Sequence, residues 1–361
     1  CKGFQIRRAL DEDALAGGPA DAAEKLRGDD EFFSVLPSSV RIFAKTRQNG
    51  QNLRGAPLEV RSARDYLLNN FSLDSCRYKA SENQIRASAK AESNKNRKNT
   101  ETVISVREAW FRYEKDSKDI LCGMNFDVHA SELTCIVGGN GAGKTTALLT
   151  AAGVFAPYRG KVKYRGKPIS TFRKDKGKIG VLVQNPLCCF VMDSVAEELE
   201  ATAKAYKLPR SGIEEVIDIM QLQSVLGSNP YDISGGELQR AAIAKLLLPK
   251  PEVIFLDEAT KGMDAFFKAE FGALLRRLAA RGTAIVLVSH DIEFCAEFAD
   301  RCAMFFNGTV IAEGTPHEVF LGNSFYTTSA CRISRGIIPD ALTSEQVIDY
   351  ANRCERKKND A

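Results

Sequence analysis

The chain has 361 residues and a formal net charge of +4, so it can hold one large domain or two ordinary ones, and its charge alone gives no reason to expect a nucleic acid partner. No apolar run approaches the roughly 18 residues that a membrane-spanning helix needs, which leaves only a peripheral membrane role. The 10 cysteines and 3 histidines lack zinc-type spacing, which disfavours a Cys/His metal site, and we interpret the cysteines as reduced, buried thiols.

The start of the chain contains a pattern that returns at its end. Three pairs of segments correspond in the same order: Phe32–Ser34 with Phe325–Thr327, Ser39–Ile42 with Ala330–Ile333, and Asp65–Leu67 with Asp349–Ala351. We therefore interpret residues 1–73 as the tail of an upstream domain that is homologous to the one that follows. Chance similarity between two amphipathic tails is the alternative. The chain also opens on Cys1 and not on Met, which we interpret as a piece of a longer protein.

Residues 74–100 are polar, poor in aromatic side chains and rich in Ser, Asn and Lys, which is typical of a solvated linker. The next segments favour strands: Thr102–Tyr113, Met124–Val128 and Lys161–Tyr164. We expect them to form an antiparallel β subdomain. Tyr113, at the end of the first strand, has two interpretations, as a core aromatic or as a ring that stacks under an adenine.

Residues 133–146, LTCIVGGNGAGKTT, contain a complete phosphate-binding loop between a predicted strand and a predicted helix. The glycines let the backbone turn and approach a phosphate closely, and the helix that follows adds free N–H groups and a partial positive charge. Lys144 is expected to reach the β- and γ-phosphates, and the Thr145 hydroxyl to bind Mg²⁺. The residues expected at the nucleotide are Gly138, Gly139, Asn140, Gly141, Ala142, Gly143, Lys144, Thr145 and Thr146.

Beyond the loop, a β-rich run over Ile179–Val183 ends at Gln184. Two helical segments follow, over Asp193–Tyr206 and Ile213–Leu226.

A further helix is predicted to start at the sequence Ser234, Gly235, Gly236, Glu237. Ser234 is placed as an N-cap with Glu237 three residues on, the spacing of a capping box. By itself this pattern predicts only a well-capped helix. Downstream of a phosphate-binding loop of this kind it is more specific than a helix cap alone.

Two apolar runs end in charged or titratable residues. Val253–Leu256 is followed by Asp257 and Glu258, and Ala284–Val288 leads to His290. Such runs are typical of parallel strands buried on both faces, and open α/β sheets bind ligands at the carboxyl ends of their strands. We expect Asp257 to hold Mg²⁺ and Glu258 to orient and deprotonate an attacking water. A histidine at a strand end is usually structural, but in this sheet contact with a γ-phosphate is the preferred interpretation of His290.

Together these motifs resemble the nucleotide-binding domain of ABC ATPases, over about Glu101 to Ile333. In that family's terms, the motifs are Walker A at Gly138–Thr145, the Q-loop at Gln184, the signature at Ser234–Glu237, Walker B at Val253–Asp257 followed by Glu258, the D-loop ending at Asp264, and the switch histidine at His290. The resemblance implies an α/β P-loop NTPase fold of ABC type, with a mainly parallel core sheet flanked by helices, an antiparallel β subdomain and a helical subdomain. The domains expected are an upstream tail at 1–73, a linker at 74–100, the ATPase domain at 101–334 with its helical subdomain at about 191–250, and a C-terminal tail at 335–361.

More narrowly, four segments look like the ATPase of energy-coupling factor importers, which take up vitamins and transition-metal ions. They are Gln184–Pro186, Val195–Leu199, Thr260–Asp264 and Ser289–Phe294. Some members fuse two ATPases in one chain, so we expect this chain to be the C-terminal half of a tandem ATPase. Two positions depart from the family pattern, since Ala259 stands where Pro is usual and Glu237 where Gln is usual. The first should loosen the D-loop slightly.

The resemblance also implies the chemistry and the partners. We expect an ATP hydrolase with ATP and Mg²⁺ as cofactors, Tyr113 under the adenine, and catalysis by Glu258, His290 and Gln184. The expected Mg²⁺ ligands are Thr145, Gln184 and Asp257.

The signature residues Ser234–Glu237 are expected to act on the nucleotide of a second ABC ATPase domain, fused or separate. The further partners implied are an integral membrane coupling subunit and a substrate-binding membrane subunit, with no nucleic acid, and they place the chain peripherally on the cytoplasmic face of the plasma membrane. The alternative is a soluble ABC ATPase that acts on ribosomes or DNA. The linker at 74–100 could imitate the charged linker of ribosomal members, whereas no sustained heptads like those of DNA-repair members occur between Thr146 and Ser234.

Overall fold

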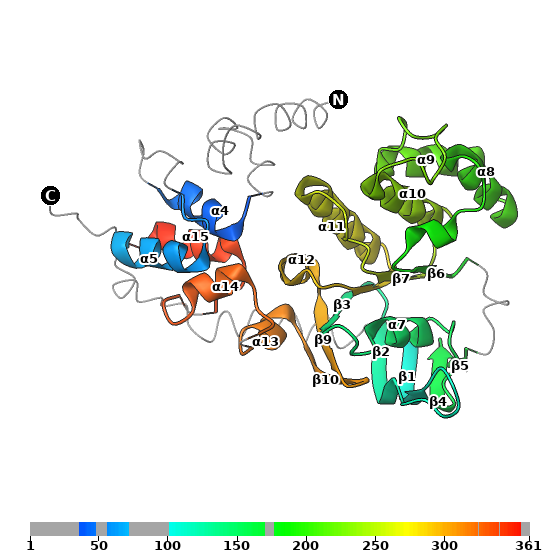
Figure 1. The fold of residues 1–361 in the computed structure, drawn as a ribbon, viewed down its shortest axis with the longest axis horizontal. Helices are drawn as coiled ribbons and strands as arrows, with labels where there is room; N and C mark the ends of the chain where they lie inside the picture. The colour runs from blue at the N-terminus through cyan, green and yellow to red at the C-terminus, as the bar shows by residue number, and fades with distance from the viewer. Residues whose placement is uncertain are drawn as a thin grey trace. The chain divides into compact units, whose positions relative to one another are not determined.

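The computed structural model describes residues 36–47, 56–71, 101–169, 177–323, 325–338 and 340–354. The predicted linker at 74–100 and the segment Phe32–Ser34 lie outside the described residues. The chain divides into two compact units, here called the sheet unit, Asn94–Val319, and the tail unit, Cys1–Ser93 with Phe320–Ala361 (Figure 1). The division falls after Val319, earlier than the expected end of the ATPase domain at residue 334.

The sheet unit is built on a six-stranded sheet with the strand order β10-β9-β3-β8-β7-β6. Its strands are β3 (Leu133–Gly138), β6 (Ile179–Leu182), β7 (Val253–Asp257), β8 (Ala284–Val288), β9 (Arg301–Phe306) and β10 (Thr309–Gly314). Neighbours from β6 to β9 pair in parallel, and β10 pairs antiparallel with β9. All residues of β3, β7 and β8 are buried, as their apolar runs predict for strands covered on both faces. The mainly parallel core sheet is therefore confirmed.

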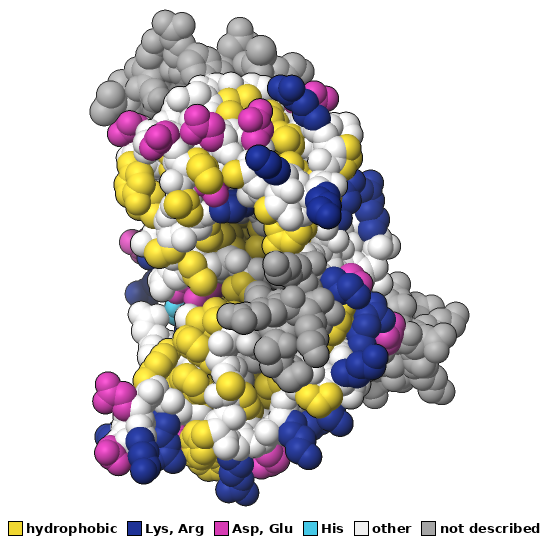
Figure 2. Space-filling view, turned by 90° about the vertical axis from the view of Figure 1, so that its right-hand side faces the viewer, with side chains coloured by type: hydrophobic (Ala, Val, Ile, Leu, Met, Phe, Trp, Pro, Cys, Tyr) yellow, Lys and Arg dark blue, Asp and Glu magenta, His cyan; other side chains and the backbone are white. Residues whose placement is uncertain are grey.

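A second, antiparallel sheet has the order β2-β1-β4-β5. Its strands are β1 (Thr102–Phe111), β2 (Leu121–His129), β4 (Arg159–Tyr164) and β5 (Lys167–Pro168). The predicted antiparallel subdomain is confirmed, although β2 starts earlier than expected and β1 ends before Tyr113. Lys161 and Lys163 of β4 are exposed, and Figure 2 shows Lys and Arg side chains around the lower part of the molecule, where this sheet lies.

One helix joins the two sheets. Ala147 and Leu148 of α7 (Lys144–Ala151) belong to the same hydrophobic core as Val106 and Met124 of the antiparallel sheet and Phe255 of β7. The helix that follows the phosphate-binding loop is thus fixed by packing against both sheets.

The helical subdomain lies between β6 and β7 in the chain. Its elements are η2 (Pro186–Cys189), α8 (Val195–Tyr206), α9 (Arg210–Met220) and α10 (Gly235–Leu247). The prediction of a helix over Ile213–Leu226 is wrong at its end, because Gln221 adopts a left-handed conformation (φ 52) that terminates α9 at Met220. After β7 come α11 (Ala265–Ala280), α12 (Ile292–Phe298) and α13 (Pro316–Phe320). Within the described ranges, no helix combines the length and the apolar character that crossing a bilayer requires.

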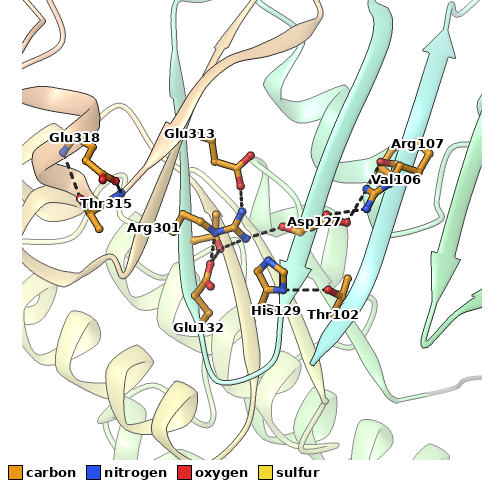
Figure 3. Close-up of polar contacts among 11 residues, drawn as sticks. Thr102, Val106, Arg107, Asp127, His129, Glu132, Arg301, Glu313, Thr315 and Glu318 are labelled. Carbon is orange, nitrogen blue, oxygen red and sulfur yellow. Dashed lines mark hydrogen bonds and ion pairs between the residues drawn. The ribbon is translucent and has the colours of Figure 1, made fainter. Parts of the chain in front are cut away.

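A buried arginine connects the strands on one side of the sheet unit. Arg301 is only 7% exposed, and its guanidinium forms ion pairs with Glu132 and Glu313 (Figure 3). It also donates to the backbone oxygen of Asp127 at 2.6 Å and to the Thr134 hydroxyl at 3.2 Å. The contacts reach β2, β3 and β10 from β9, so this charge is compensated in place and holds the antiparallel sheet against the core sheet.

The tail unit is formed by helices from both ends of the chain: α4 (Ser38–Thr46), α5 (Val60–Asn70), α14 (Ser329–Ser334) and α15 (Ser344–Arg353). They share one core, to which Ile42, Leu67, Ile333 and Val347 contribute. Arg41 pairs with Glu345 across the two ends. Seven described cysteines are free thiols, but Cys354 is disulfide-bonded, so the interpretation of the cysteines as reduced thiols is wrong for this one.

The four described helices of the tail unit contact each other in a reciprocal way. α4 packs against α15, and α5 packs against α14. α4 and α14 both begin one residue before the corresponding segments Ser39–Ile42 and Ala330–Ile333, and the last residue of each segment, Ile42 or Ile333, is fully buried. α5 and α15 likewise begin at equivalent distances before Asp65 and Asp349. This is the pattern of a pseudo-twofold pair, in which each member presents the same surface to the other.

Candidate nucleotide-binding site

The glycine-rich loop follows β3 and needs glycine at two of its positions for steric reasons. Gly143 has φ 98, and a Cβ there would lie 3.0 Å from the backbone oxygen of Ile120. At Gly138 (φ 157) a Cβ would lie 2.2 Å from the backbone oxygen of Phe305. No other residue fits these positions without displacing neighbouring backbone, so the loop keeps the close, turned path that lets its N–H groups converge on an anion.

Lys144 is the first residue of α7 and is only 7% exposed. Its Nζ donates hydrogen bonds to the backbone oxygens of Gly138 at 3.0 Å and Gly139 at 2.8 Å. Burial lowers the pKa of Lys144, while the carboxylates of Glu258 and Asp257 act in the opposite direction. The ammonium therefore lies across the mouth of its own loop, where an incoming phosphate would replace carbonyl contacts with charge-assisted ones.

Asp257 ends β7 and is almost fully buried, at 1% exposure. Neither of its carboxylate oxygens accepts a hydrogen bond from any described group. Burial raises the pKa of Asp257, and the Thr145 hydroxyl, which lies close but outside hydrogen-bond geometry, lowers it only in part. Burying a carboxylate without a hydrogen-bond donor costs free energy unless a cation binds it. Mg²⁺ binds oxygen ligands, so the Asp257 carboxylate and the nearby Thr145 hydroxyl are suited to hold it.

Glu258 is the next residue and has an unusual backbone conformation for a non-glycine residue, with φ 51. Such conformations cost roughly 1–3 kcal/mol and persist where the surroundings fix them. Here the Glu258 N–H donates to the Val288 oxygen at 2.9 Å. Its carboxylate lies between Gln184 Nε2 at 3.0 Å and His290 Nε2 at 3.3 Å. The turn thus directs the carboxylate out of the sheet edge, toward the two other residues expected in catalysis.

Tyr113 lies just beyond β1 and packs with its ring edge toward Phe111 (5.2 Å) and Phe155 (5.8 Å), which stack on each other. Its hydroxyl hydrogen-bonds with that of Thr146 at 3.0 Å, so the ring is fixed above the first turn of α7. Tyr113 is nevertheless 60% exposed. Of the two interpretations from sequence, the exposed, oriented ring favours a platform for a base over a core residue.

The glycine-serine turn at the start of α10 lies at the surface. Ser234 and Gly235 are exposed. The predicted capping box is present: the Ser234 N–H donates to Glu237 Oε2 at 3.0 Å, and the Glu237 N–H donates to Ser234 Oγ at 3.4 Å. The Glu237 carboxylate is thus directed at its own turn. Asp264 is exposed too and caps α11 through the Phe267 N–H at 2.8 Å.

A protein-family model described as ABC transporter matches residues 121–261. The energy-coupling factor transporter ATP-binding protein EcfA of Methanocaldococcus jannaschii is 32% identical over 226 residues, which are 60% of this chain and 81% of that protein. EcfA1 of Bacillus licheniformis is 34% identical over 62% of this chain and 82% of its own length. The chain belongs to the ABC transporter ATP-binding proteins. Its sheet unit is an ABC ATPase domain, with ATP and Mg²⁺ as cofactors.

Longer relatives extend beyond this chain. A putative ABC transporter ATP-binding protein of Bacillus thuringiensis is 36% identical over 92% of the chain but only 58% of its own length, so the chain spans little more than half of that relative. Among solved structures, cbiO1 of Clostridium perfringens, part of an ABC transporter complex, is 29% identical with a TM-score of 0.54, over 60% of this chain and 90% of that one.

The ABC ATPase domain also contains a buried ion pair that the sequence did not reveal. Glu198 of α8 is 3% exposed, pairs with Lys245 of α10, and accepts hydrogen bonds from the N–H groups of Val191 and Met192, both at 2.9 Å. Burial alone would raise the pKa of Glu198, but Lys245 and the two N–H groups outweigh it and lower the pKa. The Ser194 side chain caps α8 by accepting a hydrogen bond from the Glu197 N–H, which defines the start of this helix. The pair fixes the segment after Gln184.

The residues predicted from sequence separate into two groups in the ABC ATPase domain. Lys144, Asp257, Glu258, Gln184 and His290 converge at the carboxyl edge of the core sheet, as their contacts and mutual effects on pKa show. The exposed turn at Ser234 shares no hydrogen bond or ion pair with any of them within the described part of the chain. In this domain the Ser234 turn therefore stands apart from the group that surrounds Glu258.

Proposed function

We propose that this chain is part of the ATP-binding and hydrolysing component of an energy-coupling factor importer, which powers the uptake of a vitamin or metal ion. The observation that carries the proposal is the separation just described, of a buried phosphate and Mg²⁺ site from an exposed signature turn. Such a domain completes its site only against a second, similar domain. The EcfA relatives, whose names specify energy-coupling factor transport, support the choice of importer.

The chemistry follows from the residues of one half-site. Lys144 and the loop N–H groups would hold the phosphates, and Asp257 and Thr145 would hold a Mg²⁺ that neutralises the charge of the phosphates. Glu258 orients the attacking water and accepts its proton, and His290 contacts the γ-phosphate. Gln184 positions Glu258 through its 3.0 Å hydrogen bond.

The second half-site comes from the other domain's signature. The exposed Ser234 and the N–H groups of α10 would bind the γ-phosphate of the nucleotide on the partner domain. ATP then joins both domains, and hydrolysis removes the γ-phosphate contacts that favour the closed pair. The importer would use the change in free energy between the closed and the open pair of ATPase domains to drive uptake.

The tail unit supports an upstream partner in the same polypeptide. Its two halves, α4 with α5 and α14 with α15, correspond in sequence order and pack reciprocally around one core. This is what we expect if residues 1–73 end a first ATPase domain whose tail pairs with the tail of the second. We therefore infer a tandem ATPase, in which the paired tails keep the two ATPase domains at a high effective concentration.

A docking place for the membrane subunits is proposed beside Gln184. Val191 is 83% exposed and Met192 is 42% exposed, although both are large apolar side chains. The backbone N–H groups of Val191 and Met192 donate hydrogen bonds to Glu198, which is itself paired with Lys245. These contacts hold the two apolar side chains in a fixed position at the surface. Figure 2 shows further hydrophobic side chains over the upper part of this side, which α8, α9 and α10 form. An integral membrane coupling subunit would bind here and place the chain peripherally on the cytoplasmic face, with a substrate-binding membrane subunit completing the importer.

Self-pairing of isolated chains tests the proposal. We expect the 361-residue chain to bind ATP but to hydrolyse it feebly, with a turnover per chain that rises with protein concentration, because two ATPase domains must meet. The measurement is phosphate release at saturating Mg-ATP over a hundredfold dilution series. Ser234→Arg, which blocks the signature surface and leaves the phosphate loop intact, should abolish the rise. A high turnover that does not depend on concentration would contradict the proposal.

A further inference from the structure

A second cavity lies in the ABC ATPase domain, away from the nucleotide site. Its volume is about 540 Å³, and its lining includes Pro251, Glu252, Gly282 and Thr283, which precede β7 and β8. The phosphate-binding loop and Glu258 lie at the other, carboxyl ends of the parallel strands. The cavity therefore opens at the edge of the core sheet opposite the ATP site and cannot be part of it.

The walls of this cavity are mostly apolar. Val216 and Ile219 of α9, Leu247 at the end of α10, Ile254 of β7, and Leu274 and Leu278 of α11 line it. Its volume falls within the roughly 300–1,000 Å³ typical of small-molecule sites, and apolar walls with a few placed polar groups are the usual composition of such sites.

Four basic side chains line the same cavity, and two of them are already neutralised. Arg165 forms an ion pair with Glu252 at 2.9 Å, and Lys250 with Glu215 at 3.0 Å. The two others, Arg277 and Arg281, have no carboxylate within ion-pair distance among the described residues. Arg277 lies in the last turn of α11 and Arg281 is the residue that caps its end, and both line the cavity.

We propose that this cavity binds a small amphipathic anion, with an apolar chain or ring between α9 and α11 and a carboxylate or other acidic group held by Arg277 and Arg281. Guanidinium forks bind carboxylates through paired, charge-assisted hydrogen bonds, and an apolar body replaces water along the Leu and Ile side chains. The site is independent of the proposed transport role, since none of its residues belongs to the ATP site.

The position of the cavity implies a structural effect of its occupant. α10 begins at the signature turn and ends with Leu247 in the cavity wall, about 20 Å away along the helix axis. A ligand that contacts α9, α10 and α11 together would restrain the helical subdomain against the core sheet. We therefore expect ligand binding to slow amide hydrogen exchange at the end of α10 and in α9.

Binding of octanoate to the 361-residue chain, measured by isothermal titration calorimetry, tests the proposal. Octanoate combines an apolar chain with one carboxylate, so we expect it to bind more tightly than 1-octanol, which lacks the charge, and than acetate, which lacks the chain. The double variant Arg277→Gln/Arg281→Gln should weaken octanoate binding by about tenfold or more. Arg210→Gln removes an exposed arginine of α9 that does not line the cavity and serves as the matched control, with unchanged affinity.

Two further readouts locate the ligand. Ile219→Trp, at a wall residue that is 40% exposed, should fill the cavity without disturbing the core and should also reduce octanoate binding. Hydrogen exchange should show protection by octanoate in α9, in α11 and at the end of α10. Absence of octanoate binding, equal binding by the double arginine variant, or protection confined to other segments would each overturn the proposal.

Discussion

Glu258→Gln should leave ATP binding intact and reduce ATP turnover by about 10²- to 10⁴-fold, the usual contribution of a placed general base. Gln has nearly the same shape as Glu. Its side-chain carbonyl oxygen can accept the hydrogen bond that Gln184 Nε2 donates to Glu258 at 3.0 Å in the parental chain. It cannot accept a proton from water at neutral pH. The variant therefore removes the base without removing the groups that hold the phosphates.

The measurement compares phosphate release and equilibrium binding of Mg-ATP for the parental chain and the variant, at the same protein concentration. Glu200→Gln, the same change at an exposed position of α8, is the matched control and should behave like the parent. A Glu258→Gln chain that turned over ATP at the parental rate would show that another group activates the water.

Lys144→Ala should weaken ATP binding by about a hundredfold or more, because hydrogen bonds to charged groups contribute roughly 1.5–3 kcal/mol each and Lys144 would form more than one with the phosphates. In the present structure the same ammonium donates hydrogen bonds to the Gly138 and Gly139 oxygens. The first of these contacts is buried and the second is partly buried, but both stay between the loop and the first residue of α7, so the loss should fall on nucleotide affinity more than on folding.

The experiment measures the Kd for ATP and the Tm of Lys144→Ala beside those of Lys163→Ala, which removes an exposed lysine of β4. We expect a large change in Kd and a small change in Tm for the first variant and neither for the second. An unchanged Kd with Lys144→Ala would exclude the phosphate role. A collapse in Tm would assign Lys144 to folding instead.

The core of the ATP site could be predicted from the sequence because its motifs are local. The loop from Gly138 to Gly143 is determined by steric limits on neighbouring backbone, and the apolar runs before Asp257 and His290 identify buried strands whose ends meet at one edge. The capping box of α10 was predicted for the same reason, since Ser234 and Glu237 interact within one turn.

Contacts between distant segments could not be predicted. Arg301 forms ion pairs with Glu132 and Glu313, and Glu198 of α8 forms one with Lys245 of α10. The partners are far apart in the sequence, where no periodic pattern relates them. The positive φ of Glu258 could not be predicted from the sequence either, because glutamate rarely adopts this conformation.

The packing of the tail helices is another contact between distant segments that the sequence did not predict. The repeat between the two ends was visible in the sequence, but its consequence, the pairing of α4 with α15 and of α5 with α14, depends on the tertiary arrangement of the tail unit. For this reason the boundary after Val319 differs from the one expected at residue 334. The buried side chains of α14 and α15 share one core with those of the helices from the chain's start.

The structure of the Glu258→Gln chain with a nonhydrolysable ATP analogue and Mg²⁺ tests the composite site most directly. We predict that the triphosphate lies on Lys144 of one ATPase domain and that the Ser234 turn of a second domain contacts the γ-phosphate. A triphosphate bound away from Lys144, or contacted by Ser234 of the same domain, would contradict the account.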